Sequence, residues 1–298
     1  MQGTIDGFHY GLVTPVAGYI MACLGAALGL RCTVRSLRTD RSWKPGWLAL
    51  GAASIGCGIW TMHFIAMLGF QVQQVSISYD APLTILSLVV AVVVVAVGVF
   101  MVGYRGTAPA VLLSAGVLTG LGVAAMHYLG MAAMRIDGQV EYDPLVVALS
   151  VVIAIGAATA ALWAAVSIRG FLASLGASVV MGVAVTGMHY TGMAAVSVRV
   201  DEIAGPRSVG GSPAVEMLPM LIGPLSFLII AGVVVMFDPM LIMGDDEPAA
   251  RTRAGRPAAA HAAESRPRVP SRTPFFDERS DGARQENTTD LTFSRSVP

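Results

Sequence analysis

Three copies of one short motif place a histidine between methionines inside apolar stretches. The copies are Met62-His63-Phe64-Ile65-Ala66-Met67, Met126-His127-Tyr128-Leu129-Gly130-Met131 and Met188-His189-Tyr190-Thr191-Gly192-Met193. An ionisable side chain in hydrocarbon is costly, and within a membrane span it usually marks a functional site. Imidazole nitrogens with thioether sulfurs form a neutral, soft ligand set, which suits copper better than magnesium, calcium or manganese. The motifs therefore predict a copper site.

Helical spacing divides the methionines into two groups. Residues four apart share a helical face, so each histidine lies on the same face as the methionine that closes its motif. The metal ligands predicted in this way are His63, His127, His189, Met67, Met131 and Met193. The leading methionines, Met62, Met126 and Met188, are rotated from the histidines by about 100°, so they either reach a second site or contact a neighbouring helix. A single such histidine is often only a packed residue; three equivalent copies favour a shared site.

The composition indicates that these motifs lie in a membrane. Of 298 residues, 55% are hydrophobic and only 13% are charged. A helix needs about 20 apolar residues to cross a bilayer. Seven stretches are long enough, and they predict an all-α bundle of seven transmembrane helices at about 9–30, 47–70, 82–104, 110–134, 144–168, 171–197 and 216–237. The net charge is zero, and we expect no nucleic-acid binding.

The surroundings of the motif repeat with it. His127 follows His63 by 64 positions, His189 follows His127 by 62, and a glycine stands seven residues before each histidine. This pattern predicts parallel internal repeats, three two-helix units plus one helix, with the histidines on the second, fourth and sixth spans at one depth. The glycines (Gly56, Gly120 and Gly182) indicate close helix packing. Asp80 and Asp143, each followed by a proline, are predicted helix N-caps.

Basic residues predict the orientation. Arg31, Arg35, Arg38, Arg41 and Lys44 are expected in the first loop, with Arg105 in the third and Arg169 in the fifth. By the positive-inside rule the N-terminus lies outside and the C-terminus in the cytoplasm, in a multi-pass protein of the inner (plasma) membrane. We expect residues 1–240 to form the membrane domain. Residues 241–298 are rich in arginine, alanine, proline and serine and are expected to be a disordered cytoplasmic tail.

At this point the chain resembles a known family. Its repeated motif, literal as Met188-His189-Tyr190-Thr191, is similar to that of the MHYT domain, a bacterial seven-helix membrane sensor. The resemblance covers residues 5–240 and implies copper binding through the histidines and methionines, with sensing of a diatomic gas or a redox change. It also makes Tyr128 and Tyr190 candidate supporting donors, although Phe64 replaces the tyrosine in the first copy. Many relatives carry a fused enzyme; we find no enzyme motif here and expect a stand-alone form.

Other functions remain open. A copper or small-solute transporter would need polar or methionine steps across the whole bilayer, and the span centres are mainly aliphatic. A haem protein would use histidine and methionine as axial ligands. His9 is a candidate fourth ligand, because with Tyr10 it is expected at the outer end of the first span. The expected partners are membrane lipid, a diatomic gas and a cytoplasmic signalling protein.

Overall fold

The computed structural model describes residues 5–6, 9–72, 77–136, 138–168, 170–199 and 213–238. Residues 241–298, for which we predict a disordered tail, lie outside this part of the chain, as does Arg169. The tail and the domain boundary at residue 240 therefore stay predictions.

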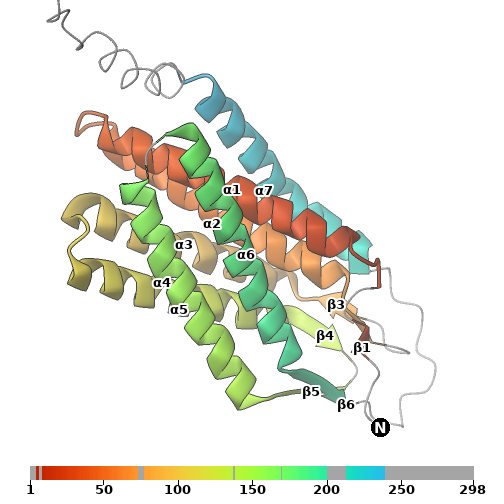
Figure 1. Ribbon diagram of the computed structural model, residues 1–298. Coiled ribbons are helices and arrows are strands. Elements are labelled where there is room, and N and C mark those ends of the chain that lie inside the picture. Colours follow the sequence, from red (N-terminus) through yellow and green to blue (C-terminus); the bar gives the residue numbers. More distant parts are fainter. Residues whose placement is uncertain are drawn as a thin grey trace, which may run out of the picture. The chain divides into compact units, whose positions relative to one another are not determined.

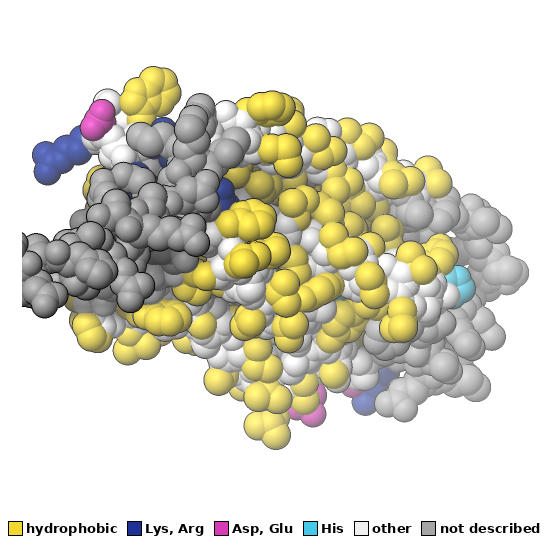
Figure 2. All heavy atoms as spheres, turned by 45° about the horizontal axis from the view of Figure 1, so that its top comes forward, with side chains coloured by type: hydrophobic (Ala, Val, Ile, Leu, Met, Phe, Trp, Pro, Cys, Tyr) yellow, Lys and Arg dark blue, Asp and Glu magenta, His cyan; other side chains and the backbone are white. Residues whose placement is uncertain are grey.

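The described residues form seven long helices. They are α1 (Val13–Leu37), α2 (Lys44–Leu68), α3 (Ala81–Arg105), α4 (Pro109–Ala133), α5 (Pro144–Ser167), α6 (Phe171–Ala194) and α7 (Pro213–Met236). Each is long and apolar enough to cross a membrane. Large aliphatic side chains such as Leu145, Leu172 and Ile229 are exposed, and hydrophobic side chains cover most of the described surface in Figure 2, with charged ones near its margins. The chain is a multi-pass membrane protein, and the predicted all-helical fold is confirmed.

The first helix differs from the prediction. It begins at Val13 and continues to Leu37, whereas the apolar pattern predicted 9–30. Arg31 and Arg35 consequently lie within α1 and not in the loop. Both arginines are accommodated in the helix by contacts with aromatic rings. The Arg31 guanidinium lies over the Phe171 ring at 5.2 Å and that of Arg35 over the Trp47 ring at 5.3 Å, so the long side chains carry their charges to the C-terminal end of α1.

Six short strands among the described residues join the helices into three equivalent units. They are β1 (Ile5–Asp6), β2 (Gln71–Val72), β3 (Ile77–Tyr79), β4 (Met134–Ile136), β5 (Gln139–Tyr142) and β6 (Val196–Arg199). The antiparallel pairs are β1 with β2, β3 with β4 and β5 with β6. Each unit therefore reads strand, helix, helix, strand, and its own two strands pair. All the strands labelled in Figure 1 lie at one end of the bundle, here named the strand end; the end with Arg31, Arg35 and Lys44 is named the basic end. The predicted three units plus one helix are confirmed.

Aspartate caps begin the first helix of two units, as predicted. Asp80 Oδ1 accepts from the Leu83 N–H at 3.0 Å, and Asp143 Oδ1 accepts from the Leu145 N–H at 2.8 Å. Each proline follows in the first turn, where its missing N–H costs no helical hydrogen bond.

A backbone hydrogen bond closes each unit at the position six residues after its histidine. The N–H groups of Asp80 and Asp143 donate to Ala133 and Ala195, at 2.8 and 2.9 Å, and the N–H of His9 donates to Gly69 at 3.0 Å. His9 thus occupies in the first unit the backbone position that the capping aspartates occupy in the other two.

The repeated glycines show how the units close into a ring. A Cβ on Gly56 would meet the backbone of Val92 in α3, one on Gly120 the backbone of Ile155 in α5, and one on Gly182 the Tyr19 ring in α1. Small residues of this kind allow close helix approach in lipid. α1 therefore covers α6 as α3 covers α2 and as α5 covers α4, while α7 packs on α1 and α2 outside this ring.

Candidate metal centre

The three motif histidines meet in the interior of the bundle. His63 of α2, His127 of α4 and His189 of α6 are each 1% exposed. The Nδ1 atom of His63 lies 3.0 Å from that of His189 and 3.1 Å from that of His127. The three ring centroids are 4.9, 5.0 and 5.1 Å apart. The prediction that the histidines share one depth is confirmed, and we call this group the histidine triad.

The triad does not satisfy its own hydrogen bonding. A neutral imidazole has one N–H and one lone pair, and Nδ1 of His63 faces two other Nδ1 atoms at once, so it can make only one full hydrogen bond with them. The Nε2 atoms of His63 and His127 are buried without a partner. Leaving such groups unpaired costs about 1–3 kcal/mol each. Around Nδ1 of His63 the arrangement is therefore unfavourable unless a further atom joins the three nitrogens.

A metal ion at the centre would fit this donor set. With the proton of each ring on Nε2, the three Nδ1 lone pairs would be available to one ion between the rings, and metal–imidazole bonds are about 2.0–2.1 Å long. Three such ligands in trigonal or tetrahedral coordination stand about 3.3–3.5 Å apart. The two distances from His63, 3.0 and 3.1 Å, would have to grow by only a few tenths of an ångström, and the candidate ligand atoms of all three rings lie within 4.8 Å of one another. The triad is the group of described residues that could hold a metal ion.

Glycines in the next unit hold two of the imidazoles. A Cβ on Gly192 of α6 would lie 2.5 Å from Nε2 of His127, and a Cβ on Gly130 of α4 would collide with Nε2 of His63. Each glycine stands three residues after the histidine of its own helix. The imidazole of one unit therefore lies against a helix of the following unit, and only a residue without a side chain leaves room for that imidazole.

The aromatic residue after each histidine packs edge-on against it. The ring planes of Phe64, Tyr128 and Tyr190 meet those of the preceding histidines at 84, 78 and 80°. Packing of this kind needs the ring and not the hydroxyl, which explains why Phe64 is accepted. The Tyr128 hydroxyl lies 2.7 Å from Ser150 Oγ in α5, so the structure directs that candidate donor away from the triad.

The six methionines lie around the triad in different surroundings. Met62, Met126, Met188, Met67 and Met131 are at most 2% exposed, and Met193 is partly buried against the same core. Of the leading methionines, Met62 packs against Gly18 of α1, its Cγ being 3.5 Å from the position of a Cβ there, and Met188 lines a cavity. Met62 thus contacts a neighbouring helix, which is one of the two roles predicted for the leading methionines. Ligation by Met67, Met131 and Met193 stays a prediction.

His9 lies outside the triad. It is exposed, and its ring packs edge-on against Tyr10 at 5.0 Å. The prediction of a fourth ligand assumed that His9 lies within the first helix, but α1 begins only at Val13 and Gly11 turns the chain with a φ of 60°. The structure therefore places this histidine at the strand end of the bundle, where its backbone N–H donates to Gly69.

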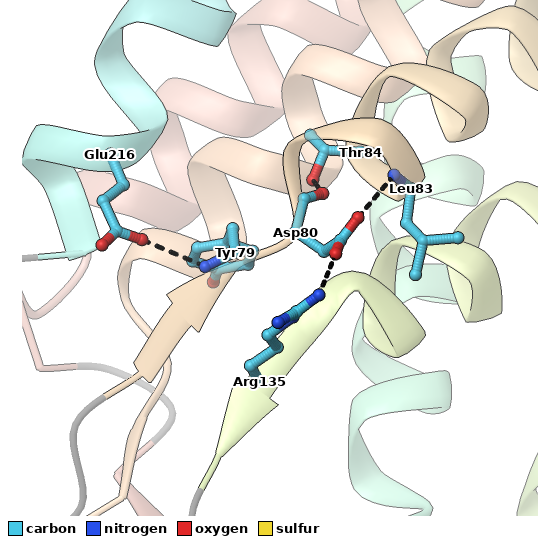
Figure 3. A network of polar contacts seen from close by, with 6 residues as sticks. All are labelled: Tyr79, Asp80, Leu83, Thr84, Arg135 and Glu216. Carbon is cyan, nitrogen blue, oxygen red and sulfur yellow. Dashed lines mark hydrogen bonds and ion pairs between the residues drawn. The ribbon is translucent and has the colours of Figure 1, made fainter.

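A polar network near the triad was not apparent from the sequence (Figure 3). Asp80 pairs with Arg135 of β4, and the Glu216 carboxylate of α7 accepts from the Tyr79 N–H at 3.1 Å. The Leu83 N–H and then Arg135 lower the pKa of Asp80. Burial, with the Glu216 charge, raises the pKa of Tyr79. Asp80 and Arg135 lie far apart in sequence and meet because β3 and β4 of one unit pair, and Glu216 reaches Tyr79 from α7.

The Tyr79 ring connects this network to the triad. Its centroid lies 6.1 Å from that of Phe64, and the Phe64 ring lies 4.7 Å from that of His63. A continuous line of packed rings thus runs from His63 through Phe64 to Tyr79, whose N–H donates to Glu216.

Comparisons with known proteins agree with the repeat. Residues 56–115, 120–178 and 182–255 match the MHYT family, described as a bacterial signalling protein N-terminal repeat. These matches begin at Gly56, Gly120 and Gly182, so the family repeat is offset by one helix from the units that close on their own strands. No solved structure matches the chain.

Curated relatives are much longer than the matched region. The bifunctional diguanylate cyclase/cyclic di-GMP phosphodiesterase MucR of Pseudomonas aeruginosa is 36% identical over 78% of this chain and 34% of its own length. The cyclic di-GMP phosphodiesterase NbdA of the same organism is 40% identical over 67% of the chain and 27% of its length. The signaling protein YkoW of Bacillus subtilis is 30% identical over 61% of the chain and 23% of its length.

The chain thus spans about a third or less of these relatives, and the activities in their names are those of the whole proteins. Together with the seven spans and the three matched repeats, these comparisons assign the chain to the MHYT family of bacterial signalling proteins, as a membrane domain whose buried histidine triad could hold a metal ion.

Proposed function

We propose that this domain is a membrane sensor that binds copper at the histidine triad and responds to a diatomic gas or a redox change. The observation that carries the proposal is that the buried Nδ1 atoms of His127 and His189 both lie within about 3 Å of Nδ1 of His63, which cannot make a full hydrogen bond with each of them. A bound ion accepts all three lone pairs. The remaining ligand positions are open to the closing methionines or to the sensed molecule.

Copper is favoured by charge and by ligand type. The triad supplies only neutral ligands, and the cost of placing an ion in a medium of low dielectric rises with the square of its charge. Singly charged Cu(I) is therefore less costly there than a divalent ion. The thioethers one turn away, Met67 and Met131, are soft ligands that select the same ion.

A sensor is supported over the two alternatives. The two layers of side chains that follow the triad toward the basic end are mostly aliphatic, so a transporter would lack a continuous series of ligands. In a haem with two axial imidazoles, the two coordinating nitrogens are about 4 Å apart, or twice the usual metal–nitrogen bond length. The 3.0 Å between the Nδ1 atoms of His63 and His189 leaves no such gap.

We further propose that the strand end faces the exterior and that the signal leaves through α7. The basic residues at the other end support this orientation by the positive-inside rule. A shift of His63 on ligation would reach Glu216 through the packed rings of Phe64 and Tyr79. At the basic end Asp238, two residues beyond α7, pairs with Arg35 at 2.9 Å. Because two relatives are named as cyclic di-GMP enzymes, the receiver is expected to act in cyclic di-GMP signalling.

Metal analysis of the purified protein tests the proposal. The protein in lipid nanodiscs is loaded with Cu(I) under a reductant and dialysed, and bound copper is measured. We expect about one ion per chain, lost in His63→Ala, His127→Ala and His189→Ala. His9→Ala is the matched control, because this histidine is exposed and lies outside the triad, and it is expected to keep the parent's stoichiometry.

The outcomes are distinct. No copper in the parent, or undiminished copper in all three triad variants, would show that the triad is not the site. Copper flux into proteoliposomes would favour the transporter, and an absorption spectrum with a Soret band after expression with haem would favour the haem protein.

A further inference from the structure

A cavity lies one helical turn from the histidine triad, on the side of the basic end. Its volume is about 50 Å³. The residues four positions before the three histidines line it, and so do the residues eight positions before them. These are Ile59, Val123 and Val185 in the first layer, and Ile55, Thr119 and Met181 in the second. Since residues four apart share a helical face, the cavity continues the axis of the triad toward the basic end, beginning about 6 Å from the imidazoles.

The chemistry of the lining excludes polar occupants. Apart from Thr119, every side chain that lines the cavity is aliphatic or a thioether. A buried water needs about two to four polar partners, and one hydroxyl cannot supply them. Cavities with such linings stay dry and take apolar guests.

The size of the cavity limits the guest further. An engineered apolar cavity of about 150 Å³ holds benzene. A cavity of about 50 Å³ is too small for an aromatic ring, and it exceeds the space of a single water. It matches a diatomic molecule or a xenon atom.

We propose that this cavity is a second binding site, distinct from the metal centre, for an uncharged apolar molecule of diatomic size. The guest binds by dispersion contacts and makes no bond to a metal. Through Met188, which lines the cavity and precedes His189, it contacts the segment of α6 that carries one histidine of the triad. The site does not require copper, and it accepts guests that concentrate in the bilayer.

Alanines of α5 form one wall and provide the means to fill the site. Ala154 and Ala158 line the cavity and are 3% and 9% exposed. Replacing Ala158 with leucine adds three carbons to the space. Ala160 lies on the same helix but faces outward, so Ala160→Leu adds the same atoms outside the cavity and is the matched control.

Xenon binding to metal-free protein in nanodiscs tests the inference. The protein is labelled at the methionine methyl groups, and the signals of Met181 and Met188 are assigned by single replacement with leucine. We expect both signals to shift with xenon pressure and to saturate. Met236, which is 69% exposed on α7, should show only the small linear change of a methyl in lipid. Ala158→Leu should abolish the saturable shifts, and Ala160→Leu should retain them.

Linear changes at Met181 and Met188, equal to that at Met236, would overturn the inference. So would full saturable shifts in folded Ala158→Leu. If that variant does not fold, Ala154→Val fills the cavity with two carbons and has the same two outcomes. Because copper is absent, the result does not depend on the proposed metal centre, and failure of either proposal leaves the other testable.

Discussion

Trp60 in α2 donates its indole N–H to Ser87 Oγ in α3 at 2.9 Å. In the next unit the hydroxyl of Tyr128 in α4 meets Ser150 Oγ in α5 at 2.7 Å. The two serines hold equivalent positions, so both units make the same bond between neighbouring helices with different donors. Trp60 thereby supplies the polar contact that Phe64 lacks.

This relationship predicts a rescue. Trp60→Phe removes the donor and part of a buried ring, and we expect the free energy of unfolding to fall by about 1–3 kcal/mol. Adding Phe64→Tyr restores a hydroxyl at the position that Tyr128 uses, so the double variant should recover part of the loss. Thermal unfolding followed by circular dichroism measures both. A double variant less stable than Trp60→Phe would contradict the equivalence of the two bonds.

Glycine packing against the imidazoles predicts a selective effect on metal binding. In Gly192→Ala the new methyl meets Nε2 of His127 and displaces the ring, so copper affinity should fall by about 10- to 100-fold. Gly187→Ala on the same helix meets no atom within 4 Å, and it should keep the affinity and gain helix stability of up to about 1 kcal/mol. Competition with a Cu(I) chelator measures the affinities. Equal affinities in the two variants would show that this contact does not position His127.

The hydrogen bond from the Tyr79 N–H to Glu216 predicts that this amide hydrogen is protected from exchange with solvent. Glu216→Leu removes a charged acceptor worth about 1.5–3 kcal/mol, so exchange of the Tyr79 amide hydrogen should become about 10- to 100-fold faster. Glu141→Leu removes another carboxylate from the strand end, one that pairs with Arg199 on the surface, and should leave Tyr79 unchanged. Hydrogen–deuterium exchange measures the rates; slow exchange in Glu216→Leu would mean that α7 is held elsewhere.

Asp80 predicts an acid-dependent loss of stability. Its pKa is lowered in the folded protein by the Leu83 N–H and by Arg135. Its stabilising effect is therefore complete above the ordinary pKa of an aspartate and is lost as the pH falls through the lowered folded value. In Asp80→Asn the melting temperature should be lower than the parent's at pH 7, and the difference should shrink below about pH 4. A difference that is constant with pH would exclude ionised Asp80 as its cause.

Much of the fold follows from patterns that act within one segment. Apolar length predicts the spans, because every helix has to cross the same hydrocarbon layer. The repeated spacing predicts that the histidines share one depth, since parallel helices of equal length bring equivalent positions together. The caps at Asp80 and Asp143 are local hydrogen bonds within three residues, which is why the sequence indicates them.

What the sequence did not indicate depends on contacts between segments. Strands of two to four residues have too little alternation to be recognised, and their pairing determines where His9 and Arg135 lie. The replacement of a phenol by the Trp60 indole is visible only when α2 and α3 are placed together. The apolar pattern predicts a start of α1 at residue 9, four residues too early. The pattern continues on the N-terminal side of Val13, although Gly11 turns the chain away from the helix there.

The triad takes one imidazole from each of three units, so none of them has a site of its own. An ion bound there would connect chain segments 64 and 62 positions apart, much as a covalent cross-link would. Its binding free energy would then add to the stability of the entire ring of helices, growing as RT ln(1 + [metal]/Kd). Occupancy of a site the size of one atom would thereby set the rigidity of the whole membrane domain. A neighbouring protein that packs on the helices could respond to that rigidity without contacting the site.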